Sequence, residues 1–160
     1  GEQIQSFHGH RGSIRHITMD SDEHMVMSTS VDRDILLWDI NSGQIVSSLH
    51  GHTDTVEKAI FLFDDQYVLS GSLDKTLILW DVATGEVVRV FRGHDGRVWD
   101  FASTADGLSI LSVSRAGQII LWRIDSNEEL KQWVVNNRFM SDFSCNEREQ
   151  YRIMPLCEGG

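Results

Sequence analysis

The stretch GHTDTVEKAIFLFDDQYVLSGSLDKTLILWD, residues 51–81, determines the architecture because its pattern occurs three times in the chain. Each copy opens with a Gly-His pair and closes with a Trp, and the copies recur every 42 residues. The pairs start at Gly9, Gly51 and Gly93, and the tryptophans are Trp38, Trp80 and Trp122. A fixed period of this length is typical of proteins built from repeated structural units, so we predict a repeat array.

Each repeat reads as a set of β-strands separated by turns. A first apolar segment begins at Ile14, Val56 or Val98, and a second ends at Ser28, Ser70 or Ser112. The third segments, residues 35–38, 77–80 and 119–122, are continuous apolar runs, as expected of strands covered on both faces. Residues 44–49 and 86–91 alternate polar and apolar, which indicates half-exposed outer strands. We therefore expect an all-β chain of four-stranded antiparallel sheets.

Composition and charge exclude several classes of function. The 160 residues are 41% hydrophobic and 24% charged, which is ordinary for a globular domain, and no apolar run approaches the ~18 residues of a membrane span. A formal net charge of −10 argues against general binding to nucleic acid or anionic membranes, because neutralising phosphates requires clustered Lys and Arg. The two cysteines, Cys145 and Cys157, are too few for a disulfide scaffold, so we expect a soluble cytoplasmic protein.

The Gly-His pair, with Trp-Asp placed 28 positions after the His in the first two repeats, resembles the WD-repeat β-propeller family over roughly residues 1–125. The resemblance implies sheets arranged as blades of a ring, with a hydrogen-bonded structural tetrad of His, Ser, Asp and Trp in each blade. The implied sets are His10, Ser28, Asp32 and Trp38, then His52, Ser70, Asp74 and Trp80, with Ser30 and Ser72 as the alternative serines. The stretch from Cys145 to Cys157 resembles the C-terminal end of bacterial WD-repeat proteins.

The third repeat departs from this pattern. It keeps His94, Ser112 and Trp122, but Ala116 stands where the tetrad requires Asp, and Arg123 follows the Trp. A His–Trp linkage without its carboxylate is weaker, so we expect this blade to be the loosest.

The repeat divides the chain into five parts. Residues 1–8 align with an outer strand and are expected to complete a preceding blade, followed by blade one at 9–50, blade two at 51–92, blade three at 93–125 and a helical tail at 126–160. Capping boxes at 126–129 and 144–147 predict the tail helices, at about 127–137 and up to about 151. Three blades and one strand fall short of the ~4 to 8 blades that close a propeller. We therefore expect further blades of a longer chain, or self-association.

Three kinds of chemistry compete with a structural interpretation. Ser, His and Asp together suggest a hydrolase, but the set recurs beside a Trp and lacks a Gly-x-Ser-x-Gly elbow. His8 and His10 have a spacing used by some metal sites, but Arg92 takes the first position in the third repeat. His16 has no carboxylate partner at a spacing that would indicate a catalytic pair. An enzyme that used the central channel would show a ring of inward-facing carboxylates or histidines, and the repeats supply none in register. We predict no catalytic residue, no metal and no cofactor.

The favoured function is a non-catalytic protein–protein interaction scaffold within a larger signalling or regulatory protein. The alternatives are a self-assembling propeller fragment and an enzyme with a site in the central channel. The resemblance implies that partners bind at residues around the start of each first strand and before each tight-turn Asp: Ser13, Arg15, Val31, Thr55, Glu57, Leu73, Arg97, Trp99 and Arg115.

The third-repeat members of this set match residue types enriched at binding hot spots. We expect Trp99 to anchor an acidic peptide that Arg97 and Arg115 clamp. The alternative is that these arginines pair with Asp95 or Asp100.

Overall fold

The computed structural model describes residues 1–124, which contain β-strands and no helix, and so no helix that could cross a membrane. The strands of the first sheet are β1 (Ile14–Met19), β2 (Met25–Ser30), β3 (Ile35–Asp39) and β4 (Ile45–Leu49). The second sheet contains β5 (Val56–Leu62), β6 (Tyr67–Ser72), β7 (Thr76–Asp81) and β8 (Val87–Arg92). The third contains β9 (Val98–Ser103), β10 (Ser109–Ser114) and β11 (Ile119–Arg123).

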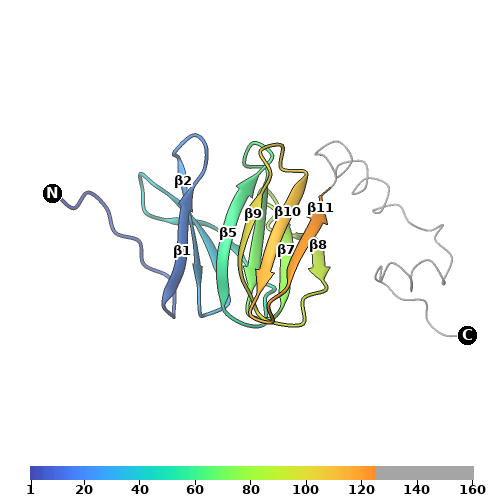
Figure 1. Cartoon of the computed structure of the whole chain (residues 1–160). Helices are drawn as coiled ribbons and strands as arrows, with labels where there is room; N and C mark the ends of the chain where they lie inside the picture. Colours follow the sequence, from blue (N-terminus) through green and yellow to red (C-terminus); the bar gives the residue numbers. More distant parts are fainter. Residues whose placement is uncertain (125–160) are drawn as a thin grey trace, which may run out of the picture. The chain divides into compact units, whose positions relative to one another are not determined.

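Each sheet is an antiparallel meander in which consecutive strands pair, so the predicted all-β partial propeller is confirmed. The first strands β1, β5 and β9 lie side by side, as Figure 1 shows, and β5 contacts both of the others. The central strands are the most buried. All six residues of β6 are buried, which agrees with the prediction of strands covered on both faces.

The ends of the array differ from the predicted pattern in two ways. Residues 1–8 form no strand in the described structure and pair with none of its three sheets, so their assignment to a preceding blade stays a prediction. Phe7 nevertheless stacks edge-on against Trp38, with ring centroids 5.8 Å apart. The third sheet has three strands rather than four within the described residues. The predicted helical tail, with its cysteines, lies outside them.

Apolar side chains from adjacent sheets form the core. Met27, Ile35, Leu37 and Leu49 of the first sheet pack with Val56, Ala59, Val68, Ile78 and Trp80 of the second. Burial of this kind is the main favourable contribution to folding. Since each blade packs on its neighbour through equivalent positions, the array has a continuous core.

The glycine of each Gly-His pair is needed for close packing against the Trp of its own blade. A Cβ added at Gly51 would lie 2.9 Å from Cη2 of Trp80, and one at Gly9 would lie 2.9 Å from the same atom of Trp38. At Gly93 the distance to Trp122 is 3.0 Å. Such contacts are too short for carbon atoms, so the Gly lets the following His reach the blade interior.

Candidate protein-interaction site

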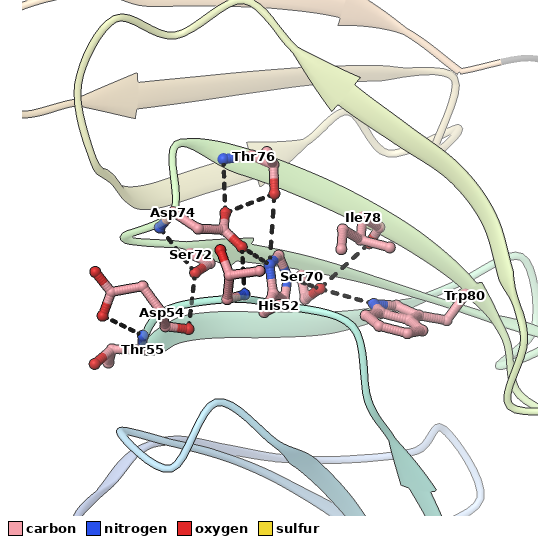
Figure 2. A network of polar contacts seen from close by, with 10 residues as sticks. His52, Asp54, Thr55, Ser70, Ser72, Asp74, Thr76, Ile78 and Trp80 are labelled. Atoms are coloured by element: carbon pink, nitrogen blue, oxygen red, sulfur yellow. Dashed lines mark hydrogen bonds and ion pairs between the residues drawn. The ribbon is translucent and has the colours of Figure 1, made fainter. Parts of the chain in front are cut away.

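The tetrad of the second blade is a closed hydrogen-bond network (Figure 2). His52 Nδ1 lies 2.8 Å from Asp74 Oδ2, and His52 Nε2 lies 2.8 Å from Ser70 Oγ. The indole Nε1 of Trp80 donates to the same hydroxyl at 2.8 Å. A carboxylate at Nδ1 assigns the proton to that nitrogen, so Nε2 accepts from the Ser70 hydroxyl.

The surroundings of Asp74 explain why this network is structural. Burial by itself raises the pKa of Asp74, but hydrogen bonds from His52, Thr76 and the Thr53 amide hold it well below its usual range. The His52 side chain is fully buried, and the Ser70 hydroxyl is used by both of its neighbours. The Ser70 hydroxyl is thus buried and engaged within the network.

The first blade repeats the arrangement. His10 lies 2.9 Å from Asp32 and 2.8 Å from Ser28, and Trp38 donates to Ser28 at 2.8 Å. Burial opposes ionisation of Asp32, but the Arg11 amide and His10 outweigh it and lower the pKa of Asp32.

The alternative serines of the first two blades have a different role. Ser30 and Ser72 accept the amide N–H groups of Asp32 and Asp74, each at 3.1 Å. They therefore shape the tight turns rather than join the tetrads.

In the third blade the network is incomplete. Ser112 lies 2.6 Å from Nε2 of His94 and accepts from the Trp122 indole at 2.6 Å. His94 Nδ1, however, is buried and has no hydrogen-bond partner among the described residues. Burial lowers the pKa of His94, and the nearby Gln118 amide and Asp95 carboxylate offset this only in part. Whether this blade is the loosest stays a prediction.

The predicted partner-binding residues lie together at one end of the sheets. The Val31 amide donates to Ser13 at 3.0 Å, and the Leu73 amide donates to Thr55 at 2.9 Å. In blade three the Arg115 amide donates to the carbonyl of Arg97 at 3.0 Å. The sheet register therefore joins the two halves of each predicted set.

A β-bulge in each first strand lies at one member of each set. The pairing of β1 with β2 skips Arg15, that of β5 with β6 skips Glu57, and that of β9 with β10 skips Trp99. Bulges commonly redirect a side chain. Arg15 then reaches across to Glu57 in a bidentate ion pair, with Nη2 2.8 Å from Oε2.

The third-blade set has no such partner. Trp99 is 53% exposed, and Arg97 and Arg115 are both exposed. Within residues 1–124 neither arginine forms an ion pair, because Asp100 binds Lys58 at 2.7 Å and Asp95 binds the Gln118 amide at 2.6 Å. The expected alternative, local pairing of the arginines with these carboxylates, is therefore not seen.

Sequence reasoning missed one row of polar residues on the first strands. His16, Lys58 and Asp100 occupy equivalent positions in the three repeats, and both Lys58 and Asp100 influence the pKa of His16, which burial lowers. The Lys58 ammonium donates to Asp100 Oδ1 and to the Phe101 carbonyl oxygen, each at 2.7 Å, and so links blade two to blade three. The row combines an imidazole, an ammonium and a carboxylate, so it is not the ring of carboxylates or histidines for which the sequence was searched. The repeat period itself was the signal that could have revealed it.

Comparison with known proteins identifies the family. The family model described as "WD domain, G-beta repeat" matches residues 1–39, 43–81 and 85–123. A comparison with curated proteins gave no match. Domains built from these repeats generally mediate protein–protein interactions. Three matches covering most of the chain, together with the sheets and tetrads described above, show that it belongs to the WD-domain, G-beta repeat family.

Proposed function

We propose that this chain is a non-catalytic interaction module that holds an acidic peptide segment of a partner against its third blade, as part of a cytoplasmic signalling or regulatory protein. The observation that carries the proposal is the pair of exposed arginines, Arg97 and Arg115, which have no carboxylate partner in the described structure and flank the exposed Trp99. The tetrads support a role without catalysis, because their hydroxyls and imidazoles serve the fold.

The other two blades present less suitable groups at the equivalent positions. Arg15 and Glu57 neutralise each other, and the Glu57 side chain is only 13% exposed. Leu73 is half-buried, and the Thr55 side chain carries no charge. Blade three is therefore the one place in this set where positive charge is not already compensated by a neighbour.

The residue types define the ligand. A guanidinium binds a carboxylate through two parallel hydrogen bonds, and an exposed indole supplies apolar area at small entropic cost. Trp and Arg are the residues most enriched at binding hot spots. Because the chain carries a net charge of −10, an acidic partner needs a local positive region, and the two arginines provide it.

A peptide library tests this proposal. Acetylated and amidated peptides with Asp or Glu fixed at the centre are measured against the full 160-residue chain by fluorescence anisotropy. We expect the tightest acidic peptide to lose at least ~10-fold in affinity when its central carboxylate becomes an amide. The Arg97→Glu/Trp99→Ala/Arg115→Glu variant should lose binding to a similar or greater degree.

The control is a double charge reversal away from this site. Arg33 belongs to the tight turn of blade one and Arg123 ends β11 at the opposite end of the sheet, so Arg33→Glu/Arg123→Glu makes the same charge change with little expected effect on binding. Equal losses in both variants would show that binding depends on net charge alone. The same affinity in wild type and triple variant, with both folded by circular dichroism, would disprove the site.

A second candidate function, self-association, is favoured by apolar side chains on the two outermost sheets. Ile17 of β1 is 63% exposed although its equivalent Ala59 is fully buried, and Ile119 of β11 is 70% exposed although its equivalent Ile35 is fully buried. The buried counterparts, Ala59 and Ile35, support the proposal that these faces contact another blade. We propose that they bind a further blade, supplied by a second copy or by a longer chain.

Light scattering tests this second candidate on the 160-residue chain. We expect a concentration-dependent mass above the 18.2 kDa of a single copy, reduced by the Ile17→Lys/Ile119→Lys variant. Val46 is exposed on the outer strand β4, and Val46→Lys serves as the matched apolar-to-charged control. A monodisperse, protease-resistant monomer would overturn the idea.

A further inference from the structure

The third tetrad lacks only its carboxylate, and the two complete tetrads show what that group does. In each of them one Asp oxygen accepts from His Nδ1 and from the amide that follows the His: His10 and Arg11 for Asp32, at 2.9 and 2.7 Å, and His52 and Thr53 for Asp74, at 2.8 and 3.0 Å. In blade three the same imidazole nitrogen is buried without a partner. A buried unsatisfied N–H is costly, so it marks a place where an acceptor would be stabilised.

Gln118 fills part of this place. Its Oε1 accepts from the Asp95 amide at 2.8 Å, which replaces one of the two contacts of the missing carboxylate. Its Nε2 donates to the Asp95 carboxylate at 2.6 Å. Both bonds are exposed to solvent. The neutral Gln118 side chain lies close enough to raise the pKa of His94, but it does not reach hydrogen-bond geometry with the buried Nδ1. A carboxylate could therefore displace a neutral side chain held only by surface hydrogen bonds.

The two arginines border the same pair of loops. The Arg115 amide bonds to the Arg97 carbonyl, and a Cβ added at Gly96 would lie 2.7 Å from the Ala116 nitrogen, so the loops at 94–97 and 115–118 are in contact. Asp95 is the negative group beside this place. With one negative and two positive side chains on these loops, a bound carboxylate would experience net attraction.

We propose that an Asp side chain of the bound peptide completes the third tetrad, accepting from His94 Nδ1 where Asp32 and Asp74 do so in the other blades. The proposal rests on the peptide-binding function above and gives it a specific anchor point. We expect an Asp side chain of the peptide to supply this carboxylate, because the complete tetrads use Asp, whose side chain is short. Arg97 and Arg115 then hold the adjacent peptide, and Gln118 swings toward solvent.

The decisive variant is Ala116→Asp, which supplies the missing carboxylate from within the chain. We expect it to reduce affinity for the best Asp-centred peptide of the library by at least ~10-fold, because His94 is then satisfied internally and the new charge opposes the peptide. Ala116→Asn is the matched control: it has nearly the same volume without the charge, and should reduce affinity much less. An unchanged affinity for Ala116→Asp, with the triple variant still unable to bind, would overturn this anchor and leave the proposed function standing.

A spectroscopic measurement keeps the test independent of how the variants fold. In the wild-type chain, long-range ¹H–¹⁵N spectra follow the imidazole of His94 during titration with the Asp-centred peptide and with its Asn counterpart. We expect the Nδ1 proton to move downfield with the Asp peptide alone. No change at His94 while the peptide binds would overturn the anchor, and failure of any acidic peptide to bind would overturn both proposals. A free C-terminal carboxylate that shifts His94 more than the amidated Asp peptide would assign the site to chain ends instead.

Discussion

Removing the carboxylate of Asp74 tests the physical account of the tetrads most directly. Asp74 accepts hydrogen bonds from His52 Nδ1 at 2.8 Å, from the Thr53 amide at 3.0 Å, and from the Thr76 amide and hydroxyl at 2.9 and 2.6 Å. In Asp74→Ala the exposed Thr53 amide can bond to water instead. The His52 side chain is fully buried, so its N–H is left with only the long contact to the Thr76 hydroxyl, 3.5 Å from Nδ1.

An unsatisfied buried donor costs ~1 to 3 kcal/mol, and the lost charged acceptor adds to this. We expect Asp74→Ala to lower the free energy of unfolding by about 2 to 3 kcal/mol, which corresponds to roughly 5 to 15 °C in Tm for a unit of this size. Asp74→Asn keeps one acceptor oxygen, so it should lower the free energy of unfolding by less. Asp22→Ala removes an exposed carboxylate of the β1–β2 turn and is the control for charge.

The assay is urea unfolding followed by Trp fluorescence, repeated as a function of pH. Because the folded state lowers the pKa of Asp74, its contribution is fully present above the ordinary carboxyl pKa of about 4 and is lost as the pH falls through the folded-state pKa. The difference between wild type and Asp74→Ala should therefore be constant from pH 8 to about pH 5 and narrow below that. A variant as stable as wild type at pH 7 would refute the reasoning.

Two further predictions concern packing and ion pairs. Gly51→Ala should lower the free energy of unfolding by about 1 to 3 kcal/mol, because its Cβ would lie 2.9 Å from the Trp80 ring, and a thermal melt compared with Gly1→Ala checks this. In a double-mutant cycle, Arg15→Ala and Glu57→Ala should show a coupling of only about 0.2 to 1 kcal/mol, because the Arg15 side chain is 44% exposed to solvent. A coupling above about 2 kcal/mol would mean that this pair is a major link between blades.

The repeat allowed the fold and the tetrads to be predicted from sequence. The first three strands of each blade and the His, Ser and Trp of the tetrad each occur three times at one spacing, so a local ambiguity in one copy is resolved by the other two. The choice of Ser70 over Ser72 was of this kind: both occupy β6, and Ser70 is the one that lies on the Trp80 indole and the His52 imidazole. Ser70 and Ser72 lie on the same face of β6 and are equally buried. They differ in partner because Ser72 ends the strand, where its hydroxyl accepts from the Asp74 amide of the tight turn.

Other features depend on the three-dimensional register and have no residue signature. The bulge positions hold Arg15, Glu57 and Trp99, which share no chemistry, so sequence alone could not show that the strand pairing is interrupted at all three. The strand expected at residues 1–8 is a different case. These residues were assigned to a preceding blade, and in the described chain they pair with none of the three sheets, so the assignment stays a prediction.

The Ala at position 116, in place of the tetrad Asp, also has an electrostatic consequence. An Asp at position 116 would stand next to Arg115 in the chain, on the loop that also contacts Gly96, and would compensate the positive charge of this surface. At a separation of ~4 Å such a pair interacts by about 1 to 4 kcal/mol, depending on solvent exposure. That is comparable to the contribution of a tetrad hydrogen bond to stability. Ala116 thus leaves His94 without its acceptor and Arg115 without its counter-charge, so stability lost within the blade and affinity for an external carboxylate arise from the same missing group.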